Sequence, residues 1–185
     1  MRLILLGTPG AGKGEQAKRL SKKFGIPHIS TGDLLRSEME GGTLVGKKIS
    51  GFVNKGELVS DEITQEILAK RIKKEDCRPG FILDGFPRNL NQADFLGKAL
   101  KKIKAPLDLV LNIEVPDITV ISRLAYRHRK DDTPETISHR LEVYQKVTAP
   151  LVDYYSKMGI LVRINGDQSM EEVTKNILES VSKSS

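Results

Sequence analysis

A short apolar run, a glycine-rich loop and a helical pattern follow one another at the start of the chain, and this order strongly constrains the fold. Residues 3–6 are apolar, and directly after them come Gly7, Gly10, Gly12, Lys13 and Gly14. The apolar spacing of residues 15–24 predicts an amphipathic helix. Strand, glycine loop, lysine and helix in this order are typical of a phosphate-binding loop. Glycines let backbone N–H groups face an anion, and the helix N-terminus and the lysine add positive charge.

The position after Lys13 departs from the usual motif. Most phosphate-binding loops place Ser or Thr there, and its hydroxyl binds Mg²⁺. This chain has Gly14, so no side chain at this position can bind a metal directly. This departure leaves fewer kinds of phosphate-binding protein that the chain could be, but it does not exclude phosphate binding. The alternative is a glycine-rich turn that binds nothing, which the strand and helix patterns on either side disfavour.

Strand and helix patterns alternate through the rest of the chain. Further short apolar runs predict strands at residues 26–29, 81–84, 107–113 and 160–164. Helical patterns occupy residues 31–40, 44–53, 61–75, 91–102, 117–126, 134–158 and 170–181. This alternation predicts an α/β fold with a five-stranded parallel sheet, helices on both faces, and ligands bound at the carboxyl ends of the strands. Residues 31–60 are interpreted as a helical insertion.

Length and composition indicate one soluble domain. The 185 residues suffice for a single core. No apolar run approaches the roughly 18 residues that a membrane span needs, and no leader-like segment precedes the first strand, so we expect a cytoplasmic protein with no membrane partner. Cys77 is the only cysteine, which excludes an internal disulfide and a four-cysteine zinc site. The state of oligomerisation cannot be read from the residues, and we expect a monomer.

The net charge of +6 admits two interpretations. One is a nucleic-acid partner, which salt-sensitive binding to RNA without nucleotide would support. The other is a lysine-rich solvated surface with a few arginines for small anions. The second is favoured because the lysines are spread in pairs along the chain and aromatic residues make up only 5% of it, which leaves few platforms for base stacking. We therefore expect no nucleic-acid partner.

Acidic and basic residues at the predicted strand ends indicate a site for phosphate chemistry. Asp84 closes an apolar strand and should lie beside Lys13, where a carboxylate suits a Mg²⁺ site, directly or through water. The alternative is a turn or capping aspartate. Six arginines are candidates for binding anions: Arg36, Arg88, Arg123, Arg127, Arg129 and Arg140. Arginine forks stabilise the charge that develops on a phosphoryl group during transfer, and a cluster of arginines would repel itself without an anion.

With these motifs together, the sequence resembles the adenylate kinases of the nucleoside monophosphate kinase family. The resemblance covers nearly the whole chain and rests on residues 7–14 (GTPGAGKG), 30–36 (STGDLLR), 84–88 (DGFPR), 129–132 (RKDD) and 148–151 (TAPL). It implies reversible transfer of the γ-phosphoryl group of ATP to AMP with Mg²⁺, giving two ADP, and a role in adenine nucleotide homeostasis. It also implies a single P-loop kinase domain over residues 1–185, with 31–60 as the AMP-binding segment and 127–132 as a short lid.

The resemblance also implies roles for individual residues. For ATP these are Gly10, Ala11, Gly12, Lys13, Gly14, Glu15, Arg123, Arg127 and Gly166, with Arg123 and Gly166 at the adenine. For AMP they are Thr31, Arg36, Glu57, Leu58, Val59, Gly85, Arg88, Gln92, Arg129 and Arg140. The catalytic set would be Lys13, Arg88, Arg129 and Arg140. Asp84 would organise Mg²⁺ through water.

The chain departs from the family pattern in two places. Glu15 stands where Thr is usual, and a carboxylate suits a helix N-terminus but not a nearby phosphate. The lid is short and lacks the cysteines with which some relatives bind zinc, so no structural zinc is expected.

Two other functions stay open. Asn89 is shared with the UMP/CMP kinases of the same fold, although Thr31 and Gln92 favour AMP. A nucleotide-dependent interaction module without catalysis would bind ATP without turnover.

Overall fold

Five parallel strands form one sheet in the order β2-β3-β1-β4-β5 in the computed structural model, which describes residues 1–126 and 133–184. The strands are β1 (Arg2–Leu6), β2 (His28–Ser30), β3 (Phe81–Asp84), β4 (Leu109–Glu114) and β5 (Leu161–Asn165). The helices are α1 (Lys13–Phe24), α2 (Thr31–Glu40), α3 (Leu44–Val53), α4 (Asp61–Ile72), α5 (Leu90–Lys102), α6 (Asp117–Ala125), α7 (Pro134–Val143), α8 (Pro150–Lys157) and α9 (Met170–Ser184). The predicted five-stranded parallel sheet is confirmed.

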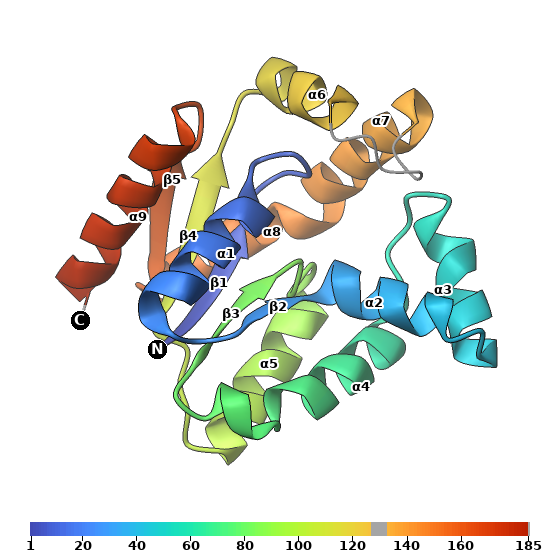
Figure 1. Cartoon of the computed structure of the whole chain (residues 1–185), viewed down its shortest axis with the longest axis horizontal. Coiled ribbons are helices and arrows are strands. Elements are labelled where there is room, and N and C mark those ends of the chain that lie inside the picture. The colour runs from blue at the N-terminus through green and yellow to red at the C-terminus, as the bar shows by residue number, and fades with distance from the viewer. Residues whose placement is uncertain (127–132, 185) are drawn as a thin grey trace.

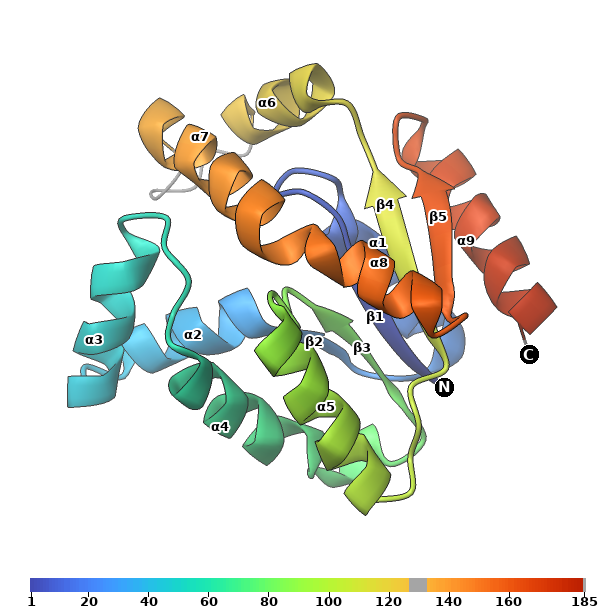
Figure 2. The same ribbon diagram turned by 180° about the vertical axis from the view of Figure 1, so that it is seen from behind.

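Two hydrophobic cores lie on opposite faces of the sheet because successive strand residues point to opposite sides. In β1, Leu3 and Leu5 pack under α1 and α9, whereas Ile4 and Leu6 pack under α4, α5 and α8. Figure 1 shows α1 and α9 in front of the sheet, and Figure 2 shows α5 and α8 in front of its other face. This layering buries both faces, as parallel sheets require.

The strand register brings the predicted phosphate-binding segments to one edge. Asp84 at the end of β3 lies opposite Leu5 of β1 and Ser30 of β2. The glycine loop therefore leaves the sheet between β3 and β4, beside Asp84. Beyond β2, residues 31–60 extend to one side of the sheet as α2, α3 and the loop that leads to α4 (Figures 1 and 2). Side-chain caps stop both helices from fraying, since Ser30 accepts from Asp33 N and Thr43 accepts from Gly46 N.

The prediction of one uninterrupted helix over residues 134–158 is wrong in its middle. The start is as predicted, with Thr133 as the capping residue and Pro134 in the first turn. Residues 144–148 then form a π-helical turn, in which the N–H of Ala149 donates to the carbonyl of Tyr144 at 2.9 Å. The cause is Pro150, which has no N–H to donate and whose ring would collide with a carbonyl of the preceding turn. The helix widens by one residue to accommodate it.

Smaller differences from the sequence prediction occur at element ends. The second strand lies at His28–Ser30 rather than 26–29, and α9 continues to Ser184. The predicted helix 61–75 ends as α4 at Ile72, and a 3₁₀ turn follows at Glu75–Cys77. Arg71 stabilises this turn by donating to both carboxylate oxygens of Asp76, at 2.9 and 2.7 Å, while Cys77 becomes buried.

Candidate active site

A cleft of about 730 Å³ opens at the carboxyl ends of the strands. Most of the residues predicted for the site line it: Gly10, Gly12, Lys13, Gly14, Glu15, Thr31, Arg36, Glu57, Leu58, Val59, Asp84, Gly85, Arg88, Gln92, Arg123 and Arg140. Ala11 does not line it, because its methyl group packs into the core under α1. Arg127 and Arg129, with the whole predicted lid 127–132, lie outside the described residues.

The glycine loop presents positive charge to this cleft. Lys13 begins α1, and its Nζ donates to the carbonyl oxygens of Gly7 at 2.7 Å and Thr8 at 2.8 Å. Gly12 precedes the helix with φ 92°, a left-handed conformation that glycine adopts without steric strain. It has no side chain with which to cap the N-terminus of α1. A lysine amine at a helix N-terminus of this kind suits an anionic ligand.

Asp84 supplies a carboxylate beside the glycine loop. Its Oδ2 lies 3.5 Å from His28 Nε2, and a Cβ at Gly14 would come within 3.3 Å of the same oxygen. Burial acts to raise the pKa of Asp84, but the neighbouring His28 imidazole and the positive charges of Lys13 and Arg88 outweigh it and lower the pKa. Asp84 is therefore ionised at neutral pH. The close approach also explains why the smallest residue stands at position 14.

Three arginines approach one another on the other side of the cleft. Arg88 Nε donates to the carbonyl of Gly85 at 2.9 Å, and Arg140 Nη2 lies 3.5 Å from the carbonyl of Val53. Burial within the cleft lowers the pKa of the Arg88 guanidinium, and the positive charges of Arg140 and Arg36 lower it further, whereas Asp84 opposes them. An arginine still keeps its proton at neutral pH. The cluster therefore carries unfavourable electrostatic energy that a bound phosphate would relieve.

Gln92 lies at the start of α5 with its amide held on two sides. Only 2% of its surface is exposed. Its Oε1 accepts from the backbone N–H of Arg88 at 2.7 Å, and its Nε2 donates to Asp61 Oδ1 at 2.7 Å. Because an amide offers two donors and two lone pairs, one of each is left after these bonds. The orientation of the amide is fixed before any ligand binds.

Three supporting residues were not predicted as parts of the site. His28 lies beside Asp84, Asp61 accepts from both Asn89 and Gln92, and Thr148 Oγ1 donates to the backbone carbonyl of Arg88 at 2.8 Å. In the sequence, His28 falls within the predicted strand 26–29 and Asp61 begins the predicted helix 61–75, and neither pattern indicates a site. The TAPL motif at residues 148–151 was the one indication of Thr148 in the sequence. The π-helical turn ends at Thr148, and its hydroxyl donates to the backbone of Arg88.

Arg123 of α6 and Gly166 meet at the far end of the cleft. Arg123 Nη2 donates to the carbonyl of Gly166 at 3.0 Å, which joins α6 to the loop after β5. Gly166 does not itself line the cleft. A Cβ at this position would come within 2.5 Å of Ile113 Cγ2, so a larger residue would push the loop away from β4. Arg123 and Gly166, which were both predicted to contact the adenine of ATP, therefore lie next to each other.

Replacing Gly85 with alanine is expected to lower the free energy of unfolding by about 1–3 kcal/mol. Gly85 has φ +80°, and an added Cβ would lie 2.7 Å from Thr31 Oγ1. Urea denaturation would measure the change. Gly97→Ala is the matched control, since Gly97 lies inside α5 with open space at its Cβ position, and it should gain about 0.5–1 kcal/mol. Equal stability of Gly85→Ala and the parent protein would contradict the strain argument.

Neither a membrane-spanning helix nor a metal-binding cluster of side chains is present in the described residues. Within residues 1–126 and 133–184, no helix has both the length and the apolar character to cross a bilayer. The same part of the chain holds no group of three or more His, Cys, Asp or Glu residues suited to a metal ion.

Comparison with known proteins identifies one family. The adenylate kinase family model matches residues 5–160. A protein named adenylate kinase from Prochlorococcus marinus (strain MIT 9211) is 52% identical, over 95% of this chain and 94% of its own length. Adenylate kinase 1 of Nostoc sp. is 50% identical, over 95% of this chain and 96% of its own.

Adenylate kinase from Caldicellulosiruptor bescii is 44% identical over 212 aligned positions, which cover 98% of this chain and 99% of that protein. Because this chain has 185 residues, that relative carries insertions that this chain lacks.

Proposed function

This chain belongs to the adenylate kinase family, and we propose that it transfers the γ-phosphoryl group of ATP to AMP, reversibly, giving two ADP and so balancing the adenine nucleotide pool. The observation that carries the proposal is the cleft itself. It joins a glycine loop with Lys13 on one side to the clustered guanidinium groups of Arg36, Arg88 and Arg140 on the other. Two anionic substrates that meet end to end would relieve the charge on both sides.

The ATP side of the cleft is proposed to be the glycine loop with α6. Lys13 and the N–H groups around Gly10, Gly12 and Gly14 would bind the phosphates. Arg123 is proposed to stack on the adenine next to the Gly166 backbone, which its hydrogen bond to Gly166 supports. Arg127, outside the described residues, completes the proposed phosphate contacts. Ala11 would contribute only its backbone, since its side chain is buried.

The AMP side is proposed to lie between α2, α5 and the loop at residues 56–59. Arg36 and Arg88 would bind the phosphate, and Gln92 would use its remaining donor and acceptor for the adenine edge. Thr31, Gly85 and the backbone of Glu57, Leu58 and Val59 would form the walls, which their place in the cleft lining supports. Arg140 and Arg129 would bridge the two substrates during transfer.

Catalysis is proposed to rest on positioning and charge stabilisation without a covalent intermediate. Phosphoryl transfer spreads negative charge over the equatorial oxygens, so fixed positive groups stabilise its transition state. Lys13, Arg88 and Arg140 line one cleft and lie on three different elements of the fold. Closure of the cleft over bound substrates would remove water, which would strengthen these interactions and limit hydrolysis of ATP.

Mg²⁺ is the proposed cofactor, and Asp84 fits it. The carboxylate is ionised and faces the cleft next to Lys13. Gly14 leaves the space beside it clear of a side chain. A hard oxygen ligand that acts through water suits Mg²⁺, which dehydrates reluctantly. With ATP, the ion would neutralise phosphate charge. No structural zinc is proposed.

Residues 31–60 are proposed to be an AMP-binding segment that closes over the substrate, with 127–132 as a short lid within the single kinase domain of residues 1–185. Two contacts join this segment to α7. His139 Nε2 lies 2.8 Å from Glu57 Oε1, and Arg140 Nη2 donates to the carbonyl of Val53.

Closure predicts slower hydrogen exchange in residues 44–58 when a bisubstrate analogue is bound. The expected protection is at least about tenfold for amides of α3. It corresponds to a rise of about 1.4 kcal/mol in the free energy of local opening when the segment closes. Mass spectrometry with and without the analogue would measure it. The α9 segment 170–184 is an internal control, since it packs on the opposite side of the sheet. Equal exchange of residues 44–58 in both states would argue against closure.

The protein is proposed to act as a cytoplasmic monomer on ATP, AMP and ADP, with no nucleic-acid or membrane partner. Size-exclusion chromatography with light scattering would test the monomeric state.

The UMP/CMP kinase alternative is weakened by one contact. Asn89, the residue shared with that group, accepts from the N–H of Gln92 and donates to Asp61, so it caps α5 and serves no base directly.

The proposed function is tested by following phosphorus NMR of the purified protein with Mg²⁺. Starting from ATP and AMP, two ADP should form for each AMP consumed. Starting from ADP alone, equal amounts of ATP and AMP should appear. Release of inorganic phosphate without consumption of AMP would contradict the proposal.

A further inference from the structure

Glu15 places a negative charge at the mouth of the proposed phosphate site. It is the third residue of α1 and lines the cleft, and about half of its side chain is exposed. A carboxylate there competes with phosphate for the positive end of the helix and repels it. The surroundings of Glu15 therefore decide how strongly this charge acts on a nucleotide.

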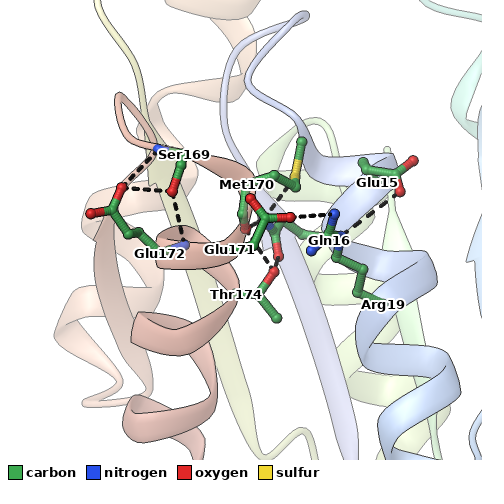
Figure 3. A network of polar contacts seen from close by, with 8 residues as sticks. All are labelled: Glu15, Gln16, Arg19, Ser169, Met170, Glu171, Glu172 and Thr174. Carbon is green, nitrogen blue, oxygen red and sulfur yellow. Dashed lines mark hydrogen bonds and ion pairs between the residues drawn. The ribbon is translucent and has the colours of Figure 1, made fainter.

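Arg19 lies between Glu15 and a second carboxylate on another helix. Its Nε is 3.9 Å from Glu15 Oε1, and its Nη2 donates to Glu171 Oε1 at 3.1 Å (Figure 3). Lys18 also approaches Glu15, at 3.8 Å, but 71% of its side chain is exposed against 36% for Arg19. The less exposed arginine is the better fixed of the two partners.

The backbone on either side of Glu171 is held in place by buried polar contacts between α1 and α9. Gln16 is 1% exposed, donates to the carbonyl of Met170 at 3.1 Å, and accepts from Thr174 Oγ1 at 2.8 Å (Figure 3). Ser169 and Glu172 cap the start of α9, because the backbone N–H of Ser169 donates to the Glu172 carboxylate and the backbone N–H of Glu172 donates to the Ser169 hydroxyl. The first turn of α9 is thus fixed against α1, which places the backbone of Glu171 within reach of Arg19, although 75% of the Glu171 side chain is exposed.

Stability does not account for this arrangement. Exposed ion pairs contribute at most about 1 kcal/mol each, and the buried Gln16 contacts already join the two helices without them. What the chain Glu171–Arg19–Glu15 does fix is the position of a charge beside the nucleotide site. Figure 3 shows the three side chains in that order along the α1–α9 junction.

We infer that Arg19 is a positioning residue for ATP, which compensates the charge of Glu15 and keeps that carboxylate on the α9 side of α1. Glu171 orients Arg19 for this purpose. The inference rests on the proposed function only in taking the glycine loop as the ATP site. It explains how the chain uses an acid at position 15, since the acid and its compensating arginine belong to one network.

The test is a double-mutant cycle on direct ATP binding and on kinetics. Arg19→Gln should raise the Kd and the KM for ATP about fivefold, the upper range for one solvent-accessible charge interaction, and leave kcat and the KM for AMP within about twofold of the parent. In the Glu15→Gln background, Arg19→Gln should change the Kd for ATP less than about twofold, because the charge it compensates is gone. Arg19→Lys, which keeps the charge, should recover most of the affinity.

Lys22→Gln is the matched control, because it removes one positive charge from an exposed position on the same helix without contact to Glu15. It should leave ATP binding unchanged. Added salt should shrink the effect of Arg19→Gln. The inference is overturned if Arg19→Gln leaves the Kd for ATP unchanged, or if it raises the Kd equally with and without Glu15. Because ATP binding is measured without AMP, a protein that bound ATP but failed to phosphorylate AMP would refute the proposed function and leave this test intact.

Discussion

Replacement of Lys13 by methionine is expected to lower kcat by about two or more orders of magnitude, since one fixed charge on a transferring phosphoryl group contributes several kcal/mol to transition-state stabilisation. Lys13 Nζ bonds two carbonyls of the glycine loop, and its charge also acts on Asp84. A methionine keeps the length of the side chain but can neither donate nor carry charge. Steady-state rates at saturating ATP and AMP would measure the loss.

The matched control for this variant is Lys23→Met, which makes the same change at an exposed position near the end of α1. It should keep full activity and the same melting temperature. Near-normal turnover of Lys13→Met would refute the role of the lysine. A phosphorylated enzyme trapped during the reaction would refute the direct transfer between substrates.

Arg88→Gln is expected to lower kcat/KM for AMP by about 100-fold, because a charge-assisted contact to phosphate in an enclosed site is worth up to about 3 kcal/mol. The same variant should melt at the same temperature as the parent protein or higher when no nucleotide is present. Burial and the nearby Arg36 and Arg140 lower the pKa of Arg88, so its charge is unfavourable in the folded state until an anion binds. Loss of activity with no loss of stability is typical of a site that carries functional strain.

The control for Arg88→Gln is Arg78→Gln, since the side chain of Arg78 is 78% exposed and pairs with Glu75 in the 3₁₀ turn after α4. Activity and melting should both stay at parental values. Calorimetric melting with and without AMP separates the two effects. If Arg88→Gln melts well below the parent in the absence of nucleotide, the electrostatic account of the arginine cluster is wrong.

Local signals in the sequence explain why most of the residues predicted for the site line one cleft. The glycine loop follows directly on β1 and precedes α1, so residues 3–24 specify it without reference to the rest of the chain. Asp84 was predicted for a similar reason, because it ends an apolar strand. Parallel sheets then bring such strand ends to one edge whatever the strand order is.

The supporting contacts could not be predicted because they join residues far apart in the chain. Asp61 meets Gln92 across 31 positions, and Thr148 meets Arg88 across 60. No periodicity reports contacts of this range. The approach of His28 to Asp84 could not be predicted either, because it depends on the register of β2 against β3.

The interruption in the helix after Pro134 was a different kind of failure. The apolar spacing on both sides of residue 150 fits one helix, and the capping residues at its start are correct. Pro150 is present in the sequence, but the apolar spacing does not show that the turn before it becomes π-helical. The consequence is functional, because the π-helical turn carries the hydroxyl that fixes the backbone of Arg88.

The acceptor specificity tests the central claim most directly. The amide of Gln92 is oriented by Asp61 and by the N–H of Arg88, with one donor and one acceptor left for a base edge. A base that leaves a buried amide unpaired costs about 1–3 kcal/mol per group, so a full mismatch should cost about 100-fold in kcat/KM.

A panel of AMP, GMP, CMP, UMP and dTMP, each with Mg²⁺ and ATP, gives the decisive measurement. AMP should exceed CMP and UMP by at least about 100-fold in kcat/KM. If CMP or UMP is the better acceptor, the assignment to AMP is wrong and the chain acts as a pyrimidine nucleotide kinase. If ATP binds and none of the five is phosphorylated, the protein is not a kinase of nucleoside monophosphates.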